Sequence, residues 1–200
     1  MTVDKAWATD TAVPTDLRDR LLTFLCKAAY KEGDFTLSSG QKSDYYINCK
    51  PVTLDAQGAL AIGRLLLPML PQGTDAVAGL TLGADPIVSA VSVVSAYERA
   101  PIPALIIRKE AKGHGTMDYI EGPALKNGAS VVVLEDVVTT GGSALKAVER
   151  LKAASYNVMR VISLVDREQG GAALYAENNL EFETLYSIGD VQAKWRKLQA

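Results

Sequence analysis

The stretch that decides the fold is Val131-Val132-Val133-Leu134-Glu135-Asp136-Val137-Val138-Thr139-Thr140-Gly141-Gly142-Ser143. Its leading aliphatic residues are typical of a strand that is buried on both faces of a parallel sheet. Two carboxylates follow where that strand ends, and a turn of hydroxyl-bearing residues and glycines leads into a helical pattern. Ligands of open α/β sheets bind at the carboxyl ends of the strands. The stretch therefore predicts an α/β protein with a ligand site at this edge of its sheet.

The turn itself predicts an anion-binding site. Glycine lets the backbone approach a ligand closely, and the first amides of a helix have no partners within the helix. Glu135 and Asp136 would repel a bare phosphate, so we expect them to bind sugar hydroxyls or a divalent cation that bridges to them. The chain has no Gly-x-x-x-x-Gly-Lys-Ser/Thr motif, and dinucleotide motifs carry their acid about 20 residues downstream. A phosphorylated sugar is favoured, and the alternative is an ordinary turn with solvated acids.

The composition limits the class of protein. The chain is 48% hydrophobic and has a formal net charge of −2. These values predict one domain over residues 1–200 and no general affinity for nucleic acid or membrane surfaces. Cys26 and Cys49 have no metal-ligating neighbours, so we expect free thiols in a reducing cytoplasm. The N-terminus has no apolar run of signal-peptide length, and the most apolar stretch, 87–97, is too short to span a bilayer.

The rest of the chain has the pattern of alternating helices and strands. Residues 14–32 predict a helix that ends at Gly33, followed by two short strands at 35–37 and 45–48 and a long helix at 55–70. The remaining expected elements are strand 75–80, helix 84–99, strand 104–108, strand 131–136, helix 142–154, strand 158–165, a helix near 171–178, strand 182–186 and a closing helix. Strands that alternate with helices predict parallel strands joined by right-handed crossovers.

A second informative stretch is Ile107-Arg108-Lys109-Glu110-Ala111-Lys112-Gly113-His114-Gly115-Thr116. It follows an apolar strand and carries three of the 21 basic residues, together with the only histidine. Glycines on both sides of the histidine indicate a hinged loop. Cations on such a loop suit a leaving group that accumulates negative charge, such as diphosphate. The alternative is a solvated surface loop.

Two further stretches offer polar groups near strand ends. The Ser-Ser-Gly turn ahead of Tyr45 and Tyr46 could clamp a planar ligand through its backbone, whereas the two tyrosines are expected to pack. Arg167 follows another strand and can pair with a carboxylate through two hydrogen bonds. A salt bridge from Arg167 to its neighbours Asp166 or Glu168 is the alternative.

The opening stretch resembles the binding motif for phosphoribosyl diphosphate (PRPP) of the type I phosphoribosyltransferases. The four stretches in this order, over about residues 14–190, are similar to those of family members that act on orotate. The resemblance implies the α/β fold of that family, a central and mostly parallel sheet flanked by helices with a small N-terminal hood. The hood would take about residues 14–50 and C-terminal elements, and the core about 51–166. Ser38 and Gly83 depart from the pattern, since some relatives have lysine there.

The resemblance also implies the site residues. The acidic pair would contact the ribose, and the turn would hold the 5-phosphate. The expected PRPP contacts are Arg108, Lys109, Lys112, His114, Glu135, Asp136, Val137, Val138, Thr139, Thr140, Gly141, Gly142 and Ser143. Thr139 and Arg167 would contact orotate, Arg167 through the carboxylate of the base. The expected catalytic residues are Lys112, His114 and Asp136, and no side chain is expected to ligate a metal directly.

The implied reaction converts orotate and PRPP to orotidine 5′-phosphate and diphosphate, with Mg²⁺ carried by PRPP. Orotate is already an anion, so the difficult step is cleavage to an oxocarbenium-like ribosyl centre as diphosphate leaves. The implied assembly is a homodimer in which the basic loop reaches the neighbouring subunit's site. Neither nucleic acid nor membrane is an expected partner.

Two other functions remain open. A transferase for another nucleobase would share the acidic-pair motif but would not need Arg167 opposite a carboxylate. A PRPP-sensing regulator that binds nucleic acid would need a basic face, whereas this chain is acidic and retains the basic loop. Diphosphate release with a panel of bases would discriminate among the three.

Overall fold

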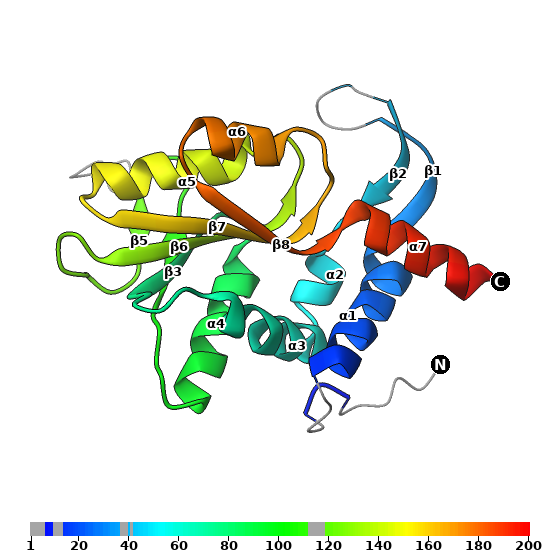
Figure 1. Cartoon of the computed structure of the whole chain (residues 1–200), viewed down its shortest axis with the longest axis horizontal. Helices are drawn as coiled ribbons and strands as arrows, with labels where there is room; N and C mark the ends of the chain where they lie inside the picture. The colour runs from blue at the N-terminus through cyan, green and yellow to red at the C-terminus, as the bar shows by residue number, and fades with distance from the viewer. Residues whose placement is uncertain (1–6, 10–13, 37–39, 41, 112–118) are drawn as a thin grey trace.

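The computed structural model describes residues 7–9, 14–36, 40, 42–111 and 119–200. Its centre is a sheet with the strand order β5-β4-β3-β6-β7-β8 (Figure 1). These strands are β3 (Ala76–Leu80), β4 (Ala104–Ile107), β5 (Ile120–Glu121), β6 (Ser130–Val138), β7 (Asn157–Asp166) and β8 (Glu181–Ser187). Neighbouring strands are parallel except for β5, which is antiparallel to β4. The predicted α/β fold with a mostly parallel sheet is confirmed.

Helices cover both faces of this sheet. α5 (Gly142–Ala153) and α6 (Gly171–Glu177) lie over one face, and α3 (Ala56–Leu66) and α4 (Asp85–Tyr97) lie over the other (Figure 1). Three more helices and a two-stranded antiparallel sheet gather at the end of the molecule away from β5. They are α1 (Pro14–Ala29), α2 (Lys50–Thr53), α7 (Ile188–Gln199), β1 (Tyr30–Thr36) and β2 (Lys42–Ile47).

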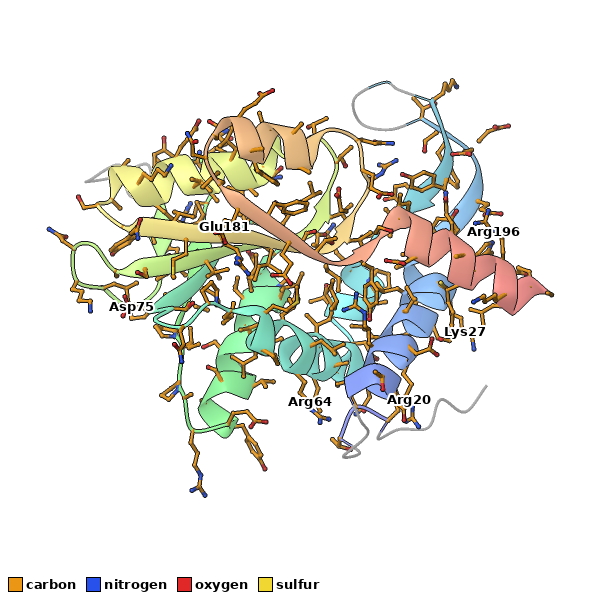
Figure 2. The ribbon with its side chains drawn as sticks, in the orientation of Figure 1. Arg20, Lys27, Arg64, Asp75, Glu181 and Arg196 are labelled. Atoms are coloured by element: carbon orange, nitrogen blue, oxygen red, sulfur yellow. The ribbon has the colours of Figure 1, made fainter. Side chains whose placement is uncertain are left out.

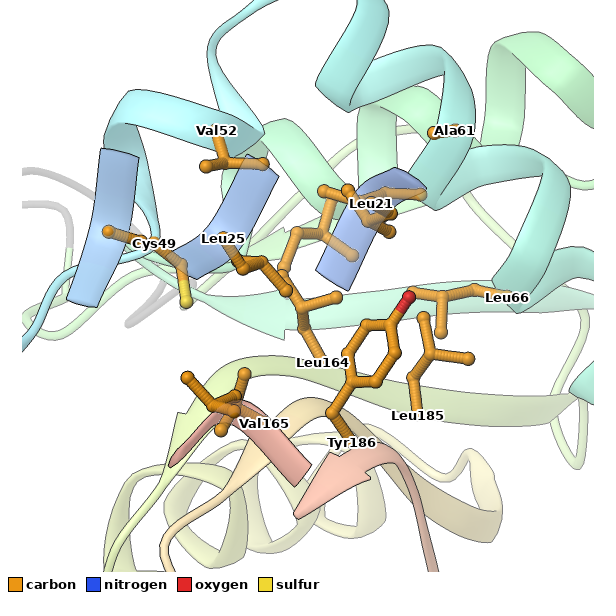
Figure 3. Packing of buried hydrophobic residues seen from close by; sticks show 14 of the residues in the cluster. Leu21, Leu25, Cys49, Val52, Ala61, Leu66, Leu164, Val165, Leu185 and Tyr186 are labelled. Atoms are coloured by element: carbon orange, nitrogen blue, oxygen red, sulfur yellow. The ribbon is translucent and has the colours of Figure 1, made fainter. Parts of the chain in front are cut away.

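β6 separates two hydrophobic cores, as expected for a central strand. Val132 and Leu134 belong to the core formed with α1, α3 and α4, whereas Val131 and Val133 belong to the core under α5. Figure 3 shows the first core, where side chains of α1 meet those of β7 and β8. The side chains of these four residues are fully buried, because successive residues of a strand point to opposite faces and both faces of the sheet are covered.

The first helix is shorter than predicted. It ends at Ala29, and the strand expected at 35–37 begins at Tyr30 instead. Tyr30 packs against the rings of Tyr45 and Trp195, at centroid distances of 5.8 and 5.6 Å. The prediction of a helix over 14–32 is therefore wrong for its last residues, because tertiary packing outweighs the helical spacing there.

The long helix expected at 55–70 also ends early. Asp55 caps α3 by accepting hydrogen bonds from two amides of the first turn. α3 ends at Leu66, and Pro68 lies in a short 3-10 helix, Leu67–Met69. Proline has no N–H with which to continue the α-helical hydrogen-bond ladder, which explains the change at this point.

Several charged side chains of α1 and α7 lie on the outside of the molecule. Arg20 and Lys27 of α1 and Arg196 of α7 are exposed, and Figure 2 shows them at the periphery. Cys26 and Cys49 are buried free thiols, as expected, and burial raises the pKa of Cys26 to about 11. None of the helices in the described ranges is long and apolar enough to cross a membrane.

Candidate active site

The turn 139–143 joins the carboxyl end of β6 to α5, and we name it the phosphate cradle. Gly141 has a φ of +86°, in the left-handed region that favours glycine, and stands directly before α5. The cradle borders a cavity of about 280 Å³. The residues that line this first cavity are Glu135, Val137, Val138, Thr139, Thr140, Gly141, Gly142, Ser143, Ala144 and Tyr175. Because the first amides of a helix attract anions, the cradle can hold a phosphate through its backbone.

The start of α6 packs against the phosphate cradle. The amide of Gly171 donates to the carbonyl of Thr139 at 3.2 Å, and the amide of Arg167 donates to the carbonyl of Val138 at 2.8 Å. A Cβ at position 171 would lie 2.3 Å from Cγ1 of Val138, so glycine is required for this approach. These contacts hold the end of β7 beside the phosphate cradle.

The acidic pair lies at the same end of β6. Glu135 is 6% exposed, and its Oε2 has no hydrogen-bond partner among the described residues. Burial, with a further contribution from the nearby Asp136, raises the pKa of Glu135 well above its usual range. Asp136 faces Gly83, where a Cβ would lie 2.5 Å from Oδ1 of the carboxylate. A buried carboxylate oxygen without a partner is uncommon in a folded protein and indicates a position for a ligand group or a water.

A second cavity, of about 210 Å³, shares residues with the first. Its lining is Lys50, Leu80, Thr81, Leu82, Gly83, Lys109, Glu135, Asp136, Val137 and Ser143. Two lysines and two acids therefore surround one space next to the phosphate cradle. This mixture suits a ligand that carries both anionic oxygens and hydroxyl groups.

The basic stretch is only partly described. Lys109 lines the second cavity, whereas Nη1 of Arg108 pairs with Oε1 of Glu121 at 3.1 Å and Arg108 lines neither cavity. The predicted contact of Arg108 with PRPP stays a prediction. Lys112 and His114 lie outside the described residues, and so does Ser38.

Arg167 is a buried cation at the carboxyl end of β7, with 7% of its surface exposed. Its Nε donates to the hydroxyl of Tyr45 at 3.0 Å, and Nη2 donates to Oγ of Ser43 at 3.4 Å. Among the described side chains it forms no ion pair, and Asp166 instead accepts a hydrogen bond from the amide of Glu168 at 2.9 Å. The alternative of a local salt bridge is thus not seen. A buried guanidinium without a counter-ion indicates an anion-binding position.

Three contributors to the site were not expected from the sequence. Tyr45 is a packing residue, as predicted, and its ring lies against that of Tyr30, but its hydroxyl also accepts the hydrogen bond from Arg167. Tyr175 is fully buried in the lining of the first cavity, and its hydroxyl has no partner in the described chain. Lys50 lines the second cavity from α2. Of these three residues, only Tyr175 could have been found from the sequence, because it follows the glycine pair at the start of α6 by one helical turn.

The acidic pair offers the carboxylate oxygens at this site that could contact a metal ion. The described part of the chain contains no group of three or more His, Cys, Asp or Glu side chains that could hold a metal ion. Carboxylate oxygens are nevertheless suitable ligands for Mg²⁺, and Oε2 of Glu135 is unpartnered within that part. The donor set fits a cation that arrives with the oxygens of a substrate.

Comparisons with known proteins agree with this geometry. Residues 61–181 match the family model of the phosphoribosyl transferase domain. The orotate phosphoribosyltransferases of Nostoc sp. and Synechocystis sp. are 69% and 65% identical to this chain; the alignments cover 94% and 95% of this chain and 91% and 96% of the relatives. The crystal structure of Mycobacterium tuberculosis orotate phosphoribosyltransferase in complex with PRPP is 30% identical, with a TM-score of 0.72 over 88% of this chain and 99% of that one. The chain belongs to the phosphoribosyltransferase family and, within it, to the orotate phosphoribosyltransferases.

Proposed function

We propose that this protein transfers the ribose 5-phosphate group of PRPP to orotate, giving orotidine 5′-phosphate and diphosphate in pyrimidine biosynthesis. The observation that carries the proposal is the burial of Arg167 beside the phosphate cradle with no carboxylate partner among the described side chains. Orotate carries the carboxylate that would pair with this guanidinium. Transferases for bases without a carboxylate would leave the cation unpaired.

PRPP would bind along the two cavities. Its 5-phosphate would accept hydrogen bonds from the backbone of the phosphate cradle, where the α5 dipole also favours negative charge. Its ribose hydroxyls would donate to Glu135 and Asp136, which supplies the hydrogen bond that Oε2 of Glu135 lacks. Its diphosphate would extend into the second cavity, toward Lys50 and Lys109.

Orotate would bind on the side of the site nearest β2. Its carboxylate would pair with Arg167, whose side chain is held by Ser43 and Tyr45. The backbone of Thr139 is fixed at the junction between the two substrates by its hydrogen bond from Gly171. A preset guanidinium would orient the base nitrogen toward the anomeric carbon of PRPP, which is an entropic contribution to catalysis.

The chemical step requires stabilisation of the departing diphosphate. Orotate is anionic before it binds, so the chain needs no strong base to generate the nucleophile. Lys109 and Lys50, together with Lys112 and His114 of the basic loop, would stabilise the charge that develops on the leaving oxygens. The carboxylates of Glu135 and Asp136 would favour the cationic ribosyl centre that forms as the bond breaks. Mg²⁺ carried by PRPP supplies further neutralisation of the diphosphate.

We also propose a cytoplasmic homodimer with shared active sites. Lys109 lines a cavity of its own chain, so sharing would concern Lys112 and His114. Mixed dimers of a Lys112→Ala chain and an Asp136→Asn chain test this arrangement. If the loop serves the partner, mixing two nearly inactive variants restores one intact site per mixed dimer, and activity rises. If activity does not return although subunit exchange is confirmed, the shared site is disproved.

A nucleobase panel tests the reaction. Purified protein is incubated with Mg²⁺, PRPP and orotate, uracil, adenine or xanthine, and released diphosphate is measured. We expect release with orotate alone. Comparable release with uracil would contradict the assignment of Arg167 to the orotate carboxylate, and no release with any base would contradict the transferase activity.

A further inference from the structure

Arg150 of α5 contacts residues 108 and 109 at the start of the basic stretch. This stretch precedes the phosphate cradle by about 30 residues in the sequence. Its Nη1 donates to the carbonyl of Arg108, and its Nη2 donates to the carbonyl of Lys109 at 2.7 Å. Its guanidinium also lies over the ring of Tyr119, 4.0 Å from the centroid. One side chain therefore holds both ends of the segment between Lys109 and Tyr119 by charge-assisted hydrogen bonds and a cation–π contact.

The two ends of that segment are also joined to each other. The amide of Arg108 donates to the carbonyl of Tyr119 at 2.8 Å, and the side chain of Arg108 pairs with Glu121. β4 and β5 continue this pairing in antiparallel register. The base of the loop is thus a closed, hydrogen-bonded unit, and Arg150 attaches this unit to α5.

The attachment links two walls of the second cavity. Ser143, in the first turn of α5, and Lys109, at the base of the loop, both line that cavity. Arg150 follows Ser143 by two helical turns, about 10 Å along a rigid helix. The phosphate cradle and Lys109 are therefore connected through one helix and one guanidinium.

We propose that Arg150 is a positioning residue that sets the place of Lys109 against the diphosphate part of PRPP. Arg150 lines neither cavity, so it acts through Lys109 and not by touching substrate. Only the guanidinium fork can reach two carbonyls and stack on a ring at once, because the ammonium group of lysine is a compact point charge. The inference rests on the proposed function, since it assigns a diphosphate to the second cavity.

Calorimetric binding of two partial ligands separates this role from a general structural one. Ribose 5-phosphate probes the phosphate cradle and the acidic pair, whereas inorganic diphosphate with Mg²⁺ probes the second cavity. For Arg150→Met we expect diphosphate affinity to fall about tenfold, because misplacement of a charged group by about 1 Å has large effects. Ribose 5-phosphate affinity should stay within about twofold of the native value, since Arg150 makes no contact with the acidic pair.

Matched variants complete the experiment. Lys152→Met removes an exposed cation from the same last turn of α5 and should leave both affinities unchanged. Arg150→Lys keeps the charge and should recover part of the diphosphate affinity. If Arg150→Met does not fold, the diphosphate and ribose 5-phosphate affinities of Arg150→Lys test the proposal in its place. The proposal is overturned if the Arg150 variants bind like Lys152→Met, or if both ligands weaken equally. If the native protein did not turn over orotate at all, that result would instead contradict the proposed function.

Discussion

Glu135 and Arg167 are buried groups of opposite charge at the ends of neighbouring strands, and the protein accommodates them differently. Glu135 leaves one oxygen without a partner among the described residues, and its pKa is raised by burial, so it can take up a proton. Arg167 cannot lose its charge, and two hydroxyl groups of β2 accept hydrogen bonds from its Nε and Nη2 without neutralising it. The acid can adapt to an empty site by protonation, whereas the cation remains dependent on an anion.

The difference suggests distinct tasks for the two regions. The surroundings of Glu135 leave its Oε2 without a hydrogen-bond partner among the described residues, so this oxygen can accept from a ligand group or a water. The surroundings of Arg167 are fixed before ligand binds, because Tyr45 both accepts from its Nε and lies under its guanidinium at 4.6 Å. Preset geometry favours selection of one carboxylate-bearing base, whereas an adaptable acid favours turnover of a large polyanion.

The largest expected effect is the loss of PRPP binding in the double variant Glu135→Gln, Asp136→Asn. Two charge-assisted hydrogen bonds to the ribose are weakened, so the affinity for PRPP should fall by about 100-fold or more. The melting temperature should stay unchanged or rise, because adjacent acids in a partly buried site destabilise the free protein. Calorimetric titration with PRPP and thermal unfolding measure the two quantities. A large drop in melting temperature would show that the acids hold a structural network.

Arg167→Met should be nearly as damaging, but to the other substrate. Truncating one partner of a buried charge pair costs about 2–5 kcal/mol, so kcat/KM for orotate should fall by about 30-fold or more. PRPP affinity should change little, since the guanidinium does not line either PRPP cavity. Arg160→Met, which removes an arginine paired with Glu181 and Glu183 on the surface, is the matched control. Equal losses for both substrates would contradict the division between the regions.

The same contrast explains how much the sequence could predict. The phosphate cradle and acidic pair are contiguous, so strand, turn and helix start were readable from one stretch and the structure brings them to one cavity. The surroundings of Arg167 combine β7 with Ser43 and Tyr45, which are more than 120 residues away in the chain. Residue spacing carries no information on that contact, and a salt bridge to Asp166 was a reasonable alternative.

Element boundaries were also predictable where they depend on a contiguous stretch and not where they depend on contacts between distant residues. Strands of the central sheet were predicted within a few residues because their burial on both faces is visible as aliphatic runs. The end of α1 was missed because Tyr30 is held by rings from β2 and α7, which only the folded chain brings together. β5 was not expected, since two residues paired with β4 leave no periodic pattern.

The pH dependence of stability provides a smaller effect, to which Glu135 contributes and Arg167 does not. The pKa of Glu135 in the folded protein is raised well above the value of 4.5 in an unfolded chain. Between these two values the folded protein retains a proton that the unfolded chain has released. Stability is therefore fullest below the unfolded pKa and falls as pH rises toward the folded one.

Glu135→Gln should remove this pH dependence. Melting temperatures of the variant and the native protein should be similar near pH 4 and should diverge in favour of the variant by about pH 8. Lys109 opposes the shift in the pKa of Glu135 and should make the change in stability smaller. Thermal unfolding at a series of pH values measures the difference. A gap between the two melting temperatures that does not vary with pH would show that the pKa of Glu135 is the same in the folded and the unfolded protein.

The smallest expected effect concerns Tyr175, which lines the first cavity and whose buried hydroxyl has no partner in the described chain. Tyr186 is equally buried, but its hydroxyl donates to the carbonyl of Arg18 at 2.7 Å. Removing a satisfied buried hydroxyl leaves its acceptor unpaired and costs about 1–3 kcal/mol, whereas removing an unsatisfied one costs little or stabilises the protein. Tyr186→Phe should therefore lower the melting temperature, and Tyr175→Phe should maintain or raise it.

The order of the two variants should reverse when PRPP affinity is measured in place of melting temperature. If the Tyr175 hydroxyl gains a hydrogen bond only when the first cavity is filled, Tyr175→Phe should weaken PRPP binding about threefold, the value of one neutral hydrogen bond. Tyr186→Phe should bind PRPP normally, because Tyr186 lines neither PRPP cavity. A Tyr175→Phe protein that loses stability and keeps full affinity would assign its hydroxyl to the fold. The opposite signs of the two measurements make the result independent of any general loosening, since a loosened protein would lose both stability and affinity.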